Sequence, residues 1–291
     1  MTTVFLPIAL GIIMFGLGLN LTVADFTRVA KVPKAAFLAL LTQIVILPVL
    51  TIGIIWVLDL SPVLAVGMML LAASPGGSTA NILSHLAGGD VALNITLTAI
   101  NSVLAIVTLP IVVNLAIDAY LGAGSEVGMQ TGKLLMVFAT VLIPVVIGMA
   151  VRKGNRAFAD RMAKPVRIAS VIVLGIVIFG TLMSVRENIG EYFAAVGVAT
   201  AIMVLLSLAL GYGIPRLAKV GQPQAVASAF EVGIHNAALA IAVALTVIGN
   251  EQMAVPGAVY GFIMFIPAGA LAWYLGRKRR AAADQRVSVT V

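Results

Sequence analysis

The segment Ser74-Pro-Gly-Gly-Ser-Thr-Ala-Asn81 interrupts a long apolar stretch, and Glu231-Val-Gly-Ile-His-Asn236 interrupts another. Each places glycine and polar residues in the middle of a segment where a plain transmembrane helix would carry Leu or Val. Pro75 removes a backbone donor and clashes with the preceding turn, and the glycines that follow it permit a break. The two segments therefore predict two discontinuous helices.

The rest of the chain is unusually apolar. Of its 291 residues, 61% are hydrophobic and 10% are charged, against about 25% charged in an average soluble domain. The mean hydropathy is +1.13, which indicates that lipid surrounds most of the surface. The apolar runs are continuous rather than alternating, which excludes a transmembrane β-barrel, and helices satisfy the backbone inside lipid. The predicted fold class is an all-α polytopic membrane protein.

Nine apolar segments are long enough to span a bilayer as helices. They cover about residues 3–22, 35–57, 63–87, 91–116, 134–151, 168–185, 193–214, 224–249 and 255–276. These segments predict one transmembrane domain over residues 1–276 and a basic tail over residues 277–291. The first segment has no basic region before it and no small-residue cleavage site after it, which favours a first span over a signal peptide.

The basic residues gather in alternate loops. With nine spans and the N-terminus outside, 16 of the 18 Lys and Arg residues fall on the cytoplasmic side, leaving only Lys133 and Arg186 outside. This asymmetry predicts an N-out, C-in protein of a bacterial inner (plasma) membrane. It also accounts for the net charge of +7 without a nucleic-acid partner.

A short motif recurs in the first and sixth predicted spans. Leu10-Gly-Ile-Ile-Met-Phe-Gly16 returns as Leu174-Gly-Ile-Val-Ile-Phe-Gly180, and the two interrupted segments fall in the third and eighth spans. Copies that are five spans apart cross the membrane in opposite directions. We therefore expect inverted repeats over about residues 3–116 and 134–276, an arrangement typical of secondary transporters.

Glu231 is the strongest candidate for a functional residue. It lies well inside an apolar segment, and no Lys or Arg lies at comparable depth, so its partner is a cation from outside or a proton. An alkali ion prefers carboxylate, amide, hydroxyl and carbonyl oxygens. Besides Glu231, the sequence offers such oxygens at Gln43, Asn81, Asn94 and Thr98, and at the carbonyls of Val232 and Ile234 that the break frees. Asn94 and Thr98 share one helix face.

Ser78, Thr79 and Asn236 stand where the second halves of the broken helices begin. Helix N-termini favour anions, so these residues predict a site for a substrate carboxylate. His235 follows the second break. A histidine inside a membrane marks a transport pathway, and its imidazole is able to titrate near neutrality. His85, near the cytoplasmic end of its span, is expected to be structural.

These residues favour sodium-coupled symport of an organic anion. A proton-coupled anion transporter and a cation/proton antiporter, both using Glu231 and His235, are the alternatives. No nucleotide-binding loop, metalloprotease motif or nucleophile–base set is visible, so no enzymatic activity is expected. We expect no cofactor beyond Na+ as the coupling ion.

Three stretches resemble the bile acid:sodium symporter family: Leu10–Leu19 with Asp25-Phe26, Pro75–Asn81 with Gly89–Leu93, and Glu231–Asn236. The resemblance implies two crossed discontinuous helices in a core domain, about residues 35–116 and 193–276. A panel domain, about residues 3–22 and 134–185, would stand beside the core. It further implies alternating access by a monomer that carries a bile-acid-like, pantoate-like or keto acid.

The resemblance also implies two sodium sites. The first would use Asn81, Asn94, Thr98 and Glu231, and the second Gln43, Glu231, His235 and the carbonyls of Val232 and Ile234. Ala80 and Asn94 stand where the family commonly has serine, and His235 replaces a glutamine. Because neutral imidazole is a poor sodium ligand, we expect the second site to be weakened, water-assisted or proton-linked. The substrate would lie between core and panel near Ser78, Thr79 and Asn236.

Overall fold

The computed structural model describes residues 2–24, 28–77, 79–122, 131–184, 186 and 189–289. Within these residues the chain is helical and forms no strand, apart from one isolated bridge. The α-helices are α1 (Thr2–Gly18), α3 (Pro33–Leu41), α4 (Leu47–Val57), α5 (Pro62–Ala73), α6 (Thr79–Ala87), α7 (Val91–Leu121), α8 (Thr131–Gly154), α9 (Arg156–Ser184), α10 (Ile189–Leu217), α11 (Gln222–Gly233), α12 (Ala237–Ala242), α13 (Val255–Ile263) and α14 (Phe265–Val289). Short 3₁₀ segments are η1 (Arg28–Lys31) and η5 (Gln252–Ala254), and π-helical turns are η2 (Thr42–Ile46) and η4 (Val243–Ile248).

Among the described residues, four continuous helices are both long and apolar enough to cross a membrane. They are Pro33–Val57, Val91–Leu121, Phe193–Leu217 and Gln252–Arg279. Two shorter apolar helices, Pro62–Ala73 and Ala237–Ile248, belong to the interrupted segments. The all-helical, membrane-type fold is thus confirmed, whereas the total of nine spans stays a prediction.

Both predicted interruptions are present. The gap between α5 and α6 follows Ala73, and the gap between α11 and α12 follows Gly233. The unwound backbones pair antiparallel: the Gly77 N–H donates to the Ile234 carbonyl (2.6 Å), and the Asn236 N–H donates to the Pro75 carbonyl (2.8 Å). Each break thereby satisfies backbone groups that the other leaves open, which is essential where water is scarce.

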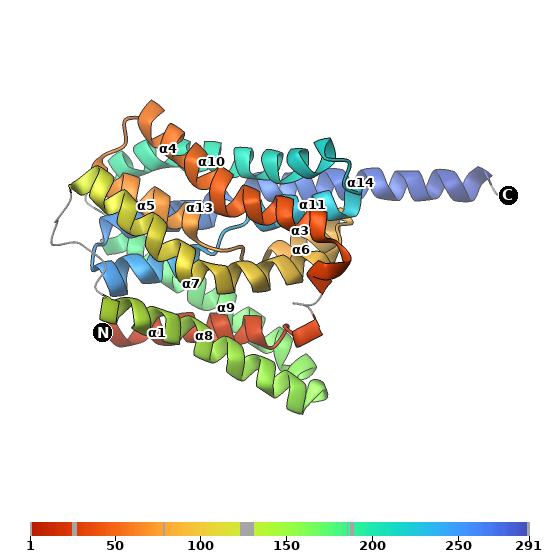
Figure 1. Ribbon diagram of the computed structural model, residues 1–291, viewed down its shortest axis with the longest axis horizontal. Coiled ribbons are helices and arrows are strands. Elements are labelled where there is room, and N and C mark those ends of the chain that lie inside the picture. The colour runs from red at the N-terminus through yellow and green to blue at the C-terminus, as the bar shows by residue number, and fades with distance from the viewer. Residues whose placement is uncertain are drawn as a thin grey trace.

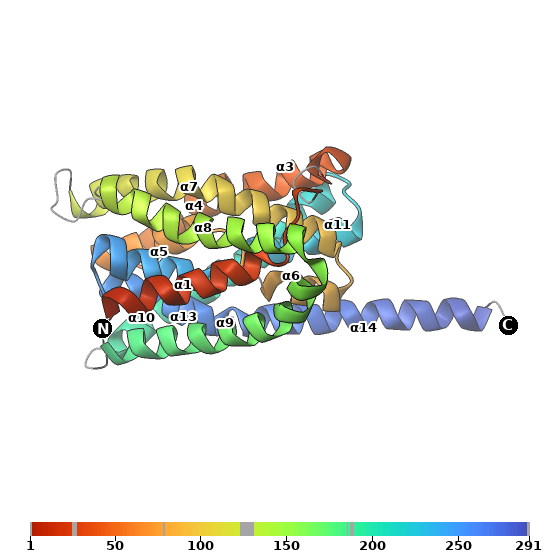
Figure 2. The ribbon, with the colours of Figure 1, turned by 90° about the horizontal axis from the view of Figure 1, so that it is seen from below.

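The helices form a bundle around this crossing. α11 packs against α10, α7, α6 and α3, so the second broken helix lies inside the bundle. Figures 1 and 2 show α1, α8 and α9 gathered on one side, with α4 and α10 on the other. α1 and α8 approach closely because Gly18 and Gly148 have no Cβ. A Cβ on Gly18 would collide with the Val145 carbonyl, and one on Gly148 would lie 2.6 Å from the Phe15 carbonyl.

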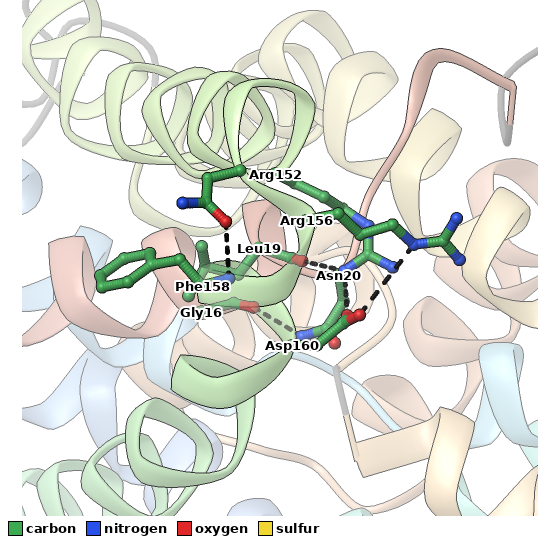
Figure 3. A network of polar contacts seen from close by, with 8 residues as sticks. Gly16, Leu19, Asn20, Arg152, Arg156, Phe158 and Asp160 are labelled. Atoms are coloured by element: carbon green, nitrogen blue, oxygen red, sulfur yellow. Dashed lines mark hydrogen bonds and ion pairs between the residues drawn. The ribbon is translucent and has the colours of Figure 1, made fainter.

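A polar network ties the end of α1 to the junction of α8 and α9 (Figure 3). Arg152 Nη1 donates to the Leu19 carbonyl (2.8 Å) and to Asp160 Oδ1 (3.0 Å). Asn20 Nδ2 donates to the Gly16 carbonyl at 2.8 Å. The network satisfies carbonyls at the C-terminal end of α1, which no longer have a partner within the helix.

The basic clusters fall at one end of the molecule. The start of α3, the α8–α9 junction, the α10–α11 junction and the projecting part of α14 all lie at the right of Figures 1 and 2. The opposite end carries the N-terminus and the junction of α4 and α5. The basic clusters thus gather at one end of the bundle, as expected for a membrane protein whose positive loops lie on one side of the membrane.

Candidate ion and substrate site

Glu231 lies in the last turn of α11 and is 1% exposed. Its Oε2 accepts hydrogen bonds from Thr98 Oγ1 (2.5 Å) and from Asn94 Nδ2 (3.1 Å). Asn94 Nδ2 also reaches the carbonyl of Ala227 at 3.2 Å. The prediction that Asn94 and Thr98 face the same way on one helix is thus realised at the carboxylate itself.

Three buried side-chain oxygens on the helices around this carboxylate have no donor among the described residues. Glu231 Oε1, Asn94 Oδ1 and Asn81 Oδ1 are buried and accept no hydrogen bond from the described residues. They belong to α11, α7 and α6, which pack against one another. Buried acceptors without partners are rare and costly. Carboxylate and amide oxygens are the ligands that a hard monovalent cation prefers, so their chemistry suits such an ion.

Gly76 brings the first break against the same carboxylate. A Cβ at this position would collide with the Glu231 carboxyl group, and the Gly76 amide also faces it. The Asn101 side chain lies beside the carboxylate as well, although its Nδ2 has no hydrogen bond of good geometry. Glycine is therefore required at residue 76 by close approach.

Gln43 and His235 form a second polar cluster at the crossing. Gln43 lies in the π-helical turn η2, and its Nε2 contacts the Ser74 carbonyl (3.0 Å) and His235 Nδ1 (3.2 Å). His235 is 1% exposed, and its Nδ1 lies 3.2 Å from the same Ser74 carbonyl. The Tyr260 ring meets the His235 ring edge-on, with 5.3 Å between the ring centroids. The Tyr260 hydroxyl donates a hydrogen bond to the Gly233 carbonyl at 2.9 Å.

The two predicted carbonyl ligands lie next to this cluster. The Ile234 carbonyl accepts the Gly77 N–H, and the Val232 carbonyl faces the ring of His235. Sequence reasoning missed Ser74 and Tyr260, which complete the surroundings of His235. No sequence signal distinguishes them, because Ser74 is one break residue among several and Tyr260 is one of two aromatic residues in an apolar helix.

A cavity of about 350 Å³ opens between the crossing and the helices α1 and α9. Its polar lining residues are Asn20, Thr79, Asn81, His85, Ser170, His235 and Asn236, and no Lys, Arg, Asp or Glu from the described part of the chain lines it. The predicted substrate residues Thr79 and Asn236 both line it, while Ser78 lies outside the described residues. Asn236 also caps α12 by accepting the Leu239 N–H at 3.1 Å.

Three polar lining residues were not predicted as substrate contacts. Asn20 comes from the end of α1, Ser170 from α9, and His85 from the last turn of α6, where only a structural role was expected. Nothing in the sequence sets these residues apart from the other polar residues of α6 and α9. These three residues line the same cavity only because α1 and α9 pack against the crossing.

Comparison with known proteins gives the family of this chain. A model of the family described as the Sodium Bile acid symporter family matches residues 7–192. The chain belongs to the sodium bile acid symporter family. The family resemblance seen in the sequence is therefore confirmed, and this symporter family consists of sodium-dependent membrane transporters rather than enzymes.

Relatives of this symporter family member come from several kingdoms. A Bacillus subtilis protein called an uncharacterized sodium-dependent transporter is 28% identical over 94% of the chain and 84% of its own length. A probable chloroplastic sodium/metabolite cotransporter of rice is 27% identical over 96% of the chain and 65% of its length. The rat sodium/bile acid cotransporter 4 is 30% identical over 82% of the chain and 55% of its length.

Proposed function

We propose that this protein is a sodium-coupled symporter that carries a small organic anion by alternating access. The observation that carries the proposal is the buried Glu231 carboxylate, whose Oε1 has no donor, with the donor-free amide oxygens of Asn94 and Asn81 on the helices packed against α11. A buried carboxylate without a cationic partner is strongly destabilising. A sodium ion supplies the missing charge and fills the open acceptor positions at once.

The substrate site would be the cavity beside the crossing. Thr79 and Asn81 line it from the first turn of α6, and Asn236 lines it from the other break. With no basic side chain from the described residues on its wall, a carboxylate would be held by hydroxyl, amide and backbone N–H donors. The smaller acids named above, pantoate-like or keto acids, suit a cavity of about 350 Å³.

The same proposal assigns the layers of the bundle. α1, α8 and α9 would form the panel, and the helices around the crossing would form the core, so that the cavity lies between the two. Nine spans with the N-terminus outside would put the basic ends of the helices in the cytoplasm of a bacterial cell. The protein would work as a monomer in the bilayer, with the sodium ion and the anion as its ligands and no other cofactor.

The test is thermal unfolding of the purified protein in sodium, with matched potassium and choline as references. A ligand that binds only the folded protein stabilises it by RT ln(1 + [L]/Kd), about 2.7 kcal/mol at a hundredfold excess over Kd. We expect a sodium-specific rise in Tm for the wild type and none for Glu231→Gln. The exposed Glu251→Gln is the matched control and should keep the rise.

Sodium-driven uptake of radiolabelled carboxylates into proteoliposomes then identifies the anion. Sodium coupling would be overturned if sodium did not change the Tm and a proton gradient drove the uptake instead. The proton-coupled alternative would then hold. A protein that sodium stabilises but that takes up none of the carboxylates would contradict the substrate class.

A further inference from the structure

Two asparagines line the cavity beside the crossing, and each uses one end of its side-chain amide to cap a helix. Asn236 Oδ1 accepts the Leu239 N–H at 3.1 Å, at the start of α12. Asn20 Nδ2 donates to the Gly16 carbonyl at 2.8 Å, at the end of α1 (Figure 3). The two caps therefore use opposite ends of the same functional group.

The backbone partners fix which end of each amide remains for a ligand. A backbone N–H only donates and a backbone carbonyl only accepts, so neither amide turns around without losing its hydrogen bond. Asn236 is left with Nδ2, which is a donor, and Asn20 is left with Oδ1, which is an acceptor. The cavity thus offers a donor on the side of the crossing and an acceptor on the side of α1.

The surroundings of Asn20 leave the polarity of this corner to its Oδ1. Ser170 on α9 is the nearest polar neighbour on the page, because a Cβ on Gly16 would lie 3.4 Å from Ser170 Oγ. A hydroxyl both donates and accepts, and so does the neutral imidazole of His85, so these two side chains fit either kind of ligand group. The other α1 side chains on the cavity wall are apolar: Ile13, Met14 and Leu17.

An acceptor in a cavity wall distinguishes ligand groups of similar size. A ligand hydroxyl donates to the Asn20 oxygen, whereas a keto oxygen would bring two acceptors face to face and leave both without a donor, which is costly away from water. An ammonium group also donates, but the Asn20 amide is neutral and supplies no counter-charge for it. A hydroxyl is therefore the group that fits this corner.

We propose that the substrate is a small hydroxycarboxylate, and that Asn20 selects it over keto and amino acids of the same carbon skeleton. The carboxylate accepts a hydrogen bond from Asn236 Nδ2 at the crossing, and the hydroxyl donates to Asn20 Oδ1 on the side of α1. The inference rests on the proposed function, since it concerns the substrate of the same cavity. It makes Asn20 a specificity-determining residue of the transporter.

The experiment compares acids that differ in one group. Pentanoate and its hydroxy, oxo and amino derivatives, substituted at C2 or at C4, are titrated on the purified protein in saturating sodium, and the rise in Tm gives the Kd of each acid. We expect the hydroxy acid to bind about tenfold more tightly than the oxo or amino acid at one of the two positions, because only the hydroxyl pairs with the Asn20 oxygen as a neutral donor.

Two variants of Asn20 separate ligand recognition from the capping of α1. Asn20→Leu removes both ends of the amide, whereas Asn20→Asp keeps an acceptor and loses the donor that binds the Gly16 carbonyl. We expect the preference for the hydroxy acid over the oxo acid to vanish in Asn20→Leu and to persist in Asn20→Asp. The added charge of Asp weakens both acids alike, since both are anions, and leaves their ratio unchanged. A residue that only caps α1 would give the same ratio in both variants.

The matched control is Asn114→Leu, the same substitution on α7 at a residue outside the cavity lining, which should keep the wild-type preference. Oxo acids that bind the wild type as tightly as the hydroxy acids, at both positions, would overturn the inference and leave sodium-coupled anion symport standing. An unchanged preference in a folded Asn20→Leu would overturn it as well. If sodium raises the Tm but none of the acids binds, the inference and the substrate class of the proposed function fail together. If neither Asn20 variant folds, the wild-type affinities decide alone.

Discussion

Thr98 donates the shortest hydrogen bond to the Glu231 carboxylate, at 2.5 Å. Thr98→Val keeps the shape of the side chain and removes the hydroxyl. A hydrogen bond to a charged group contributes about 1.5–3 kcal/mol, so we expect sodium affinity to fall by about tenfold or more. Sodium titration of Tm measures this loss. Thr98→Ser restores the hydroxyl and should recover most of the affinity; a Thr98→Val protein with wild-type affinity would contradict the assigned role.

Gly76 provides a second prediction about a single residue. A Cβ there would collide with the Glu231 carboxyl group, so Gly76→Ala should remove the sodium-dependent rise in Tm by displacing the carboxylate. Gly175→Ala is the control, because a Cβ at that helical glycine would meet nothing within 4 Å. Equal sodium responses of the two variants would show that the close approach does not matter for binding.

The sequence predicts which polar side chains gather around Glu231, because burial of a carboxylate in an apolar segment has few physical solutions, while their role as sodium ligands stays a prediction. Glu231, Asn94 and Thr98 meet as expected. The surroundings of His235 were not predictable in the same way. They depend on Tyr260 and on the Ser74 carbonyl, which become neighbours only when α13 and both breaks have packed together.

At the scale of elements, the contact between α1 and α8 depends on glycine. A Cβ on Gly148 would lie 2.6 Å from the Phe15 carbonyl and 2.7 Å from the Leu19 nitrogen. Gly148→Ala should therefore cost about 1–3 kcal/mol through overpacking and lower Tm in sodium-free buffer. Gly154→Ala, with no atom within 4 Å of its Cβ, should leave Tm nearly unchanged. A Gly148→Ala protein as stable as the wild type would mean that the two helices separate easily.

Proline and glycine predicted the two broken helices because these residues impose backbone conformations locally. The π-helical turns η2 and η4 had no such signal. Thr42–Ile46 contains no glycine or proline, yet it widens into a π turn that carries Gln43 to the crossing. π turns frequently occur at functional sites, and this one carries the Gln43 side chain that contacts the Ser74 carbonyl.

For the whole molecule, the predicted orientation is testable because the chain has no cysteine. A single introduced cysteine is then the only target for a thiol reagent. Ser61→Cys, between α4 and α5, should react with a membrane-impermeant maleimide in intact cells, while Gly154→Cys, at the end of α8, should react only in inside-out vesicles. Both residues are exposed. The reverse pattern would invert the orientation, and labelling of both from one side would contradict an odd number of spans between them.

The charge pattern along the sequence anticipated one basic end of the bundle, since loop charges are read without knowing any contact. The sequence placed Thr79 and Asn236 at a substrate site, and both line the cavity of about 350 Å³. It did not indicate Asn20, His85 or Ser170, because α1, α6 and α9 bring them to the cavity from distant parts of the chain.

The pairing of the two breaks also bears on how the protein is made. Ser74 and His235 are 161 positions apart, so at about 5–20 residues per second the ribosome needs roughly 8–30 s to deliver the second break after the first. During that interval the open backbone of the first break has no partner of its own chain. Insertion machinery or interfacial water has to shelter it, and the ion site is completed only near the end of synthesis.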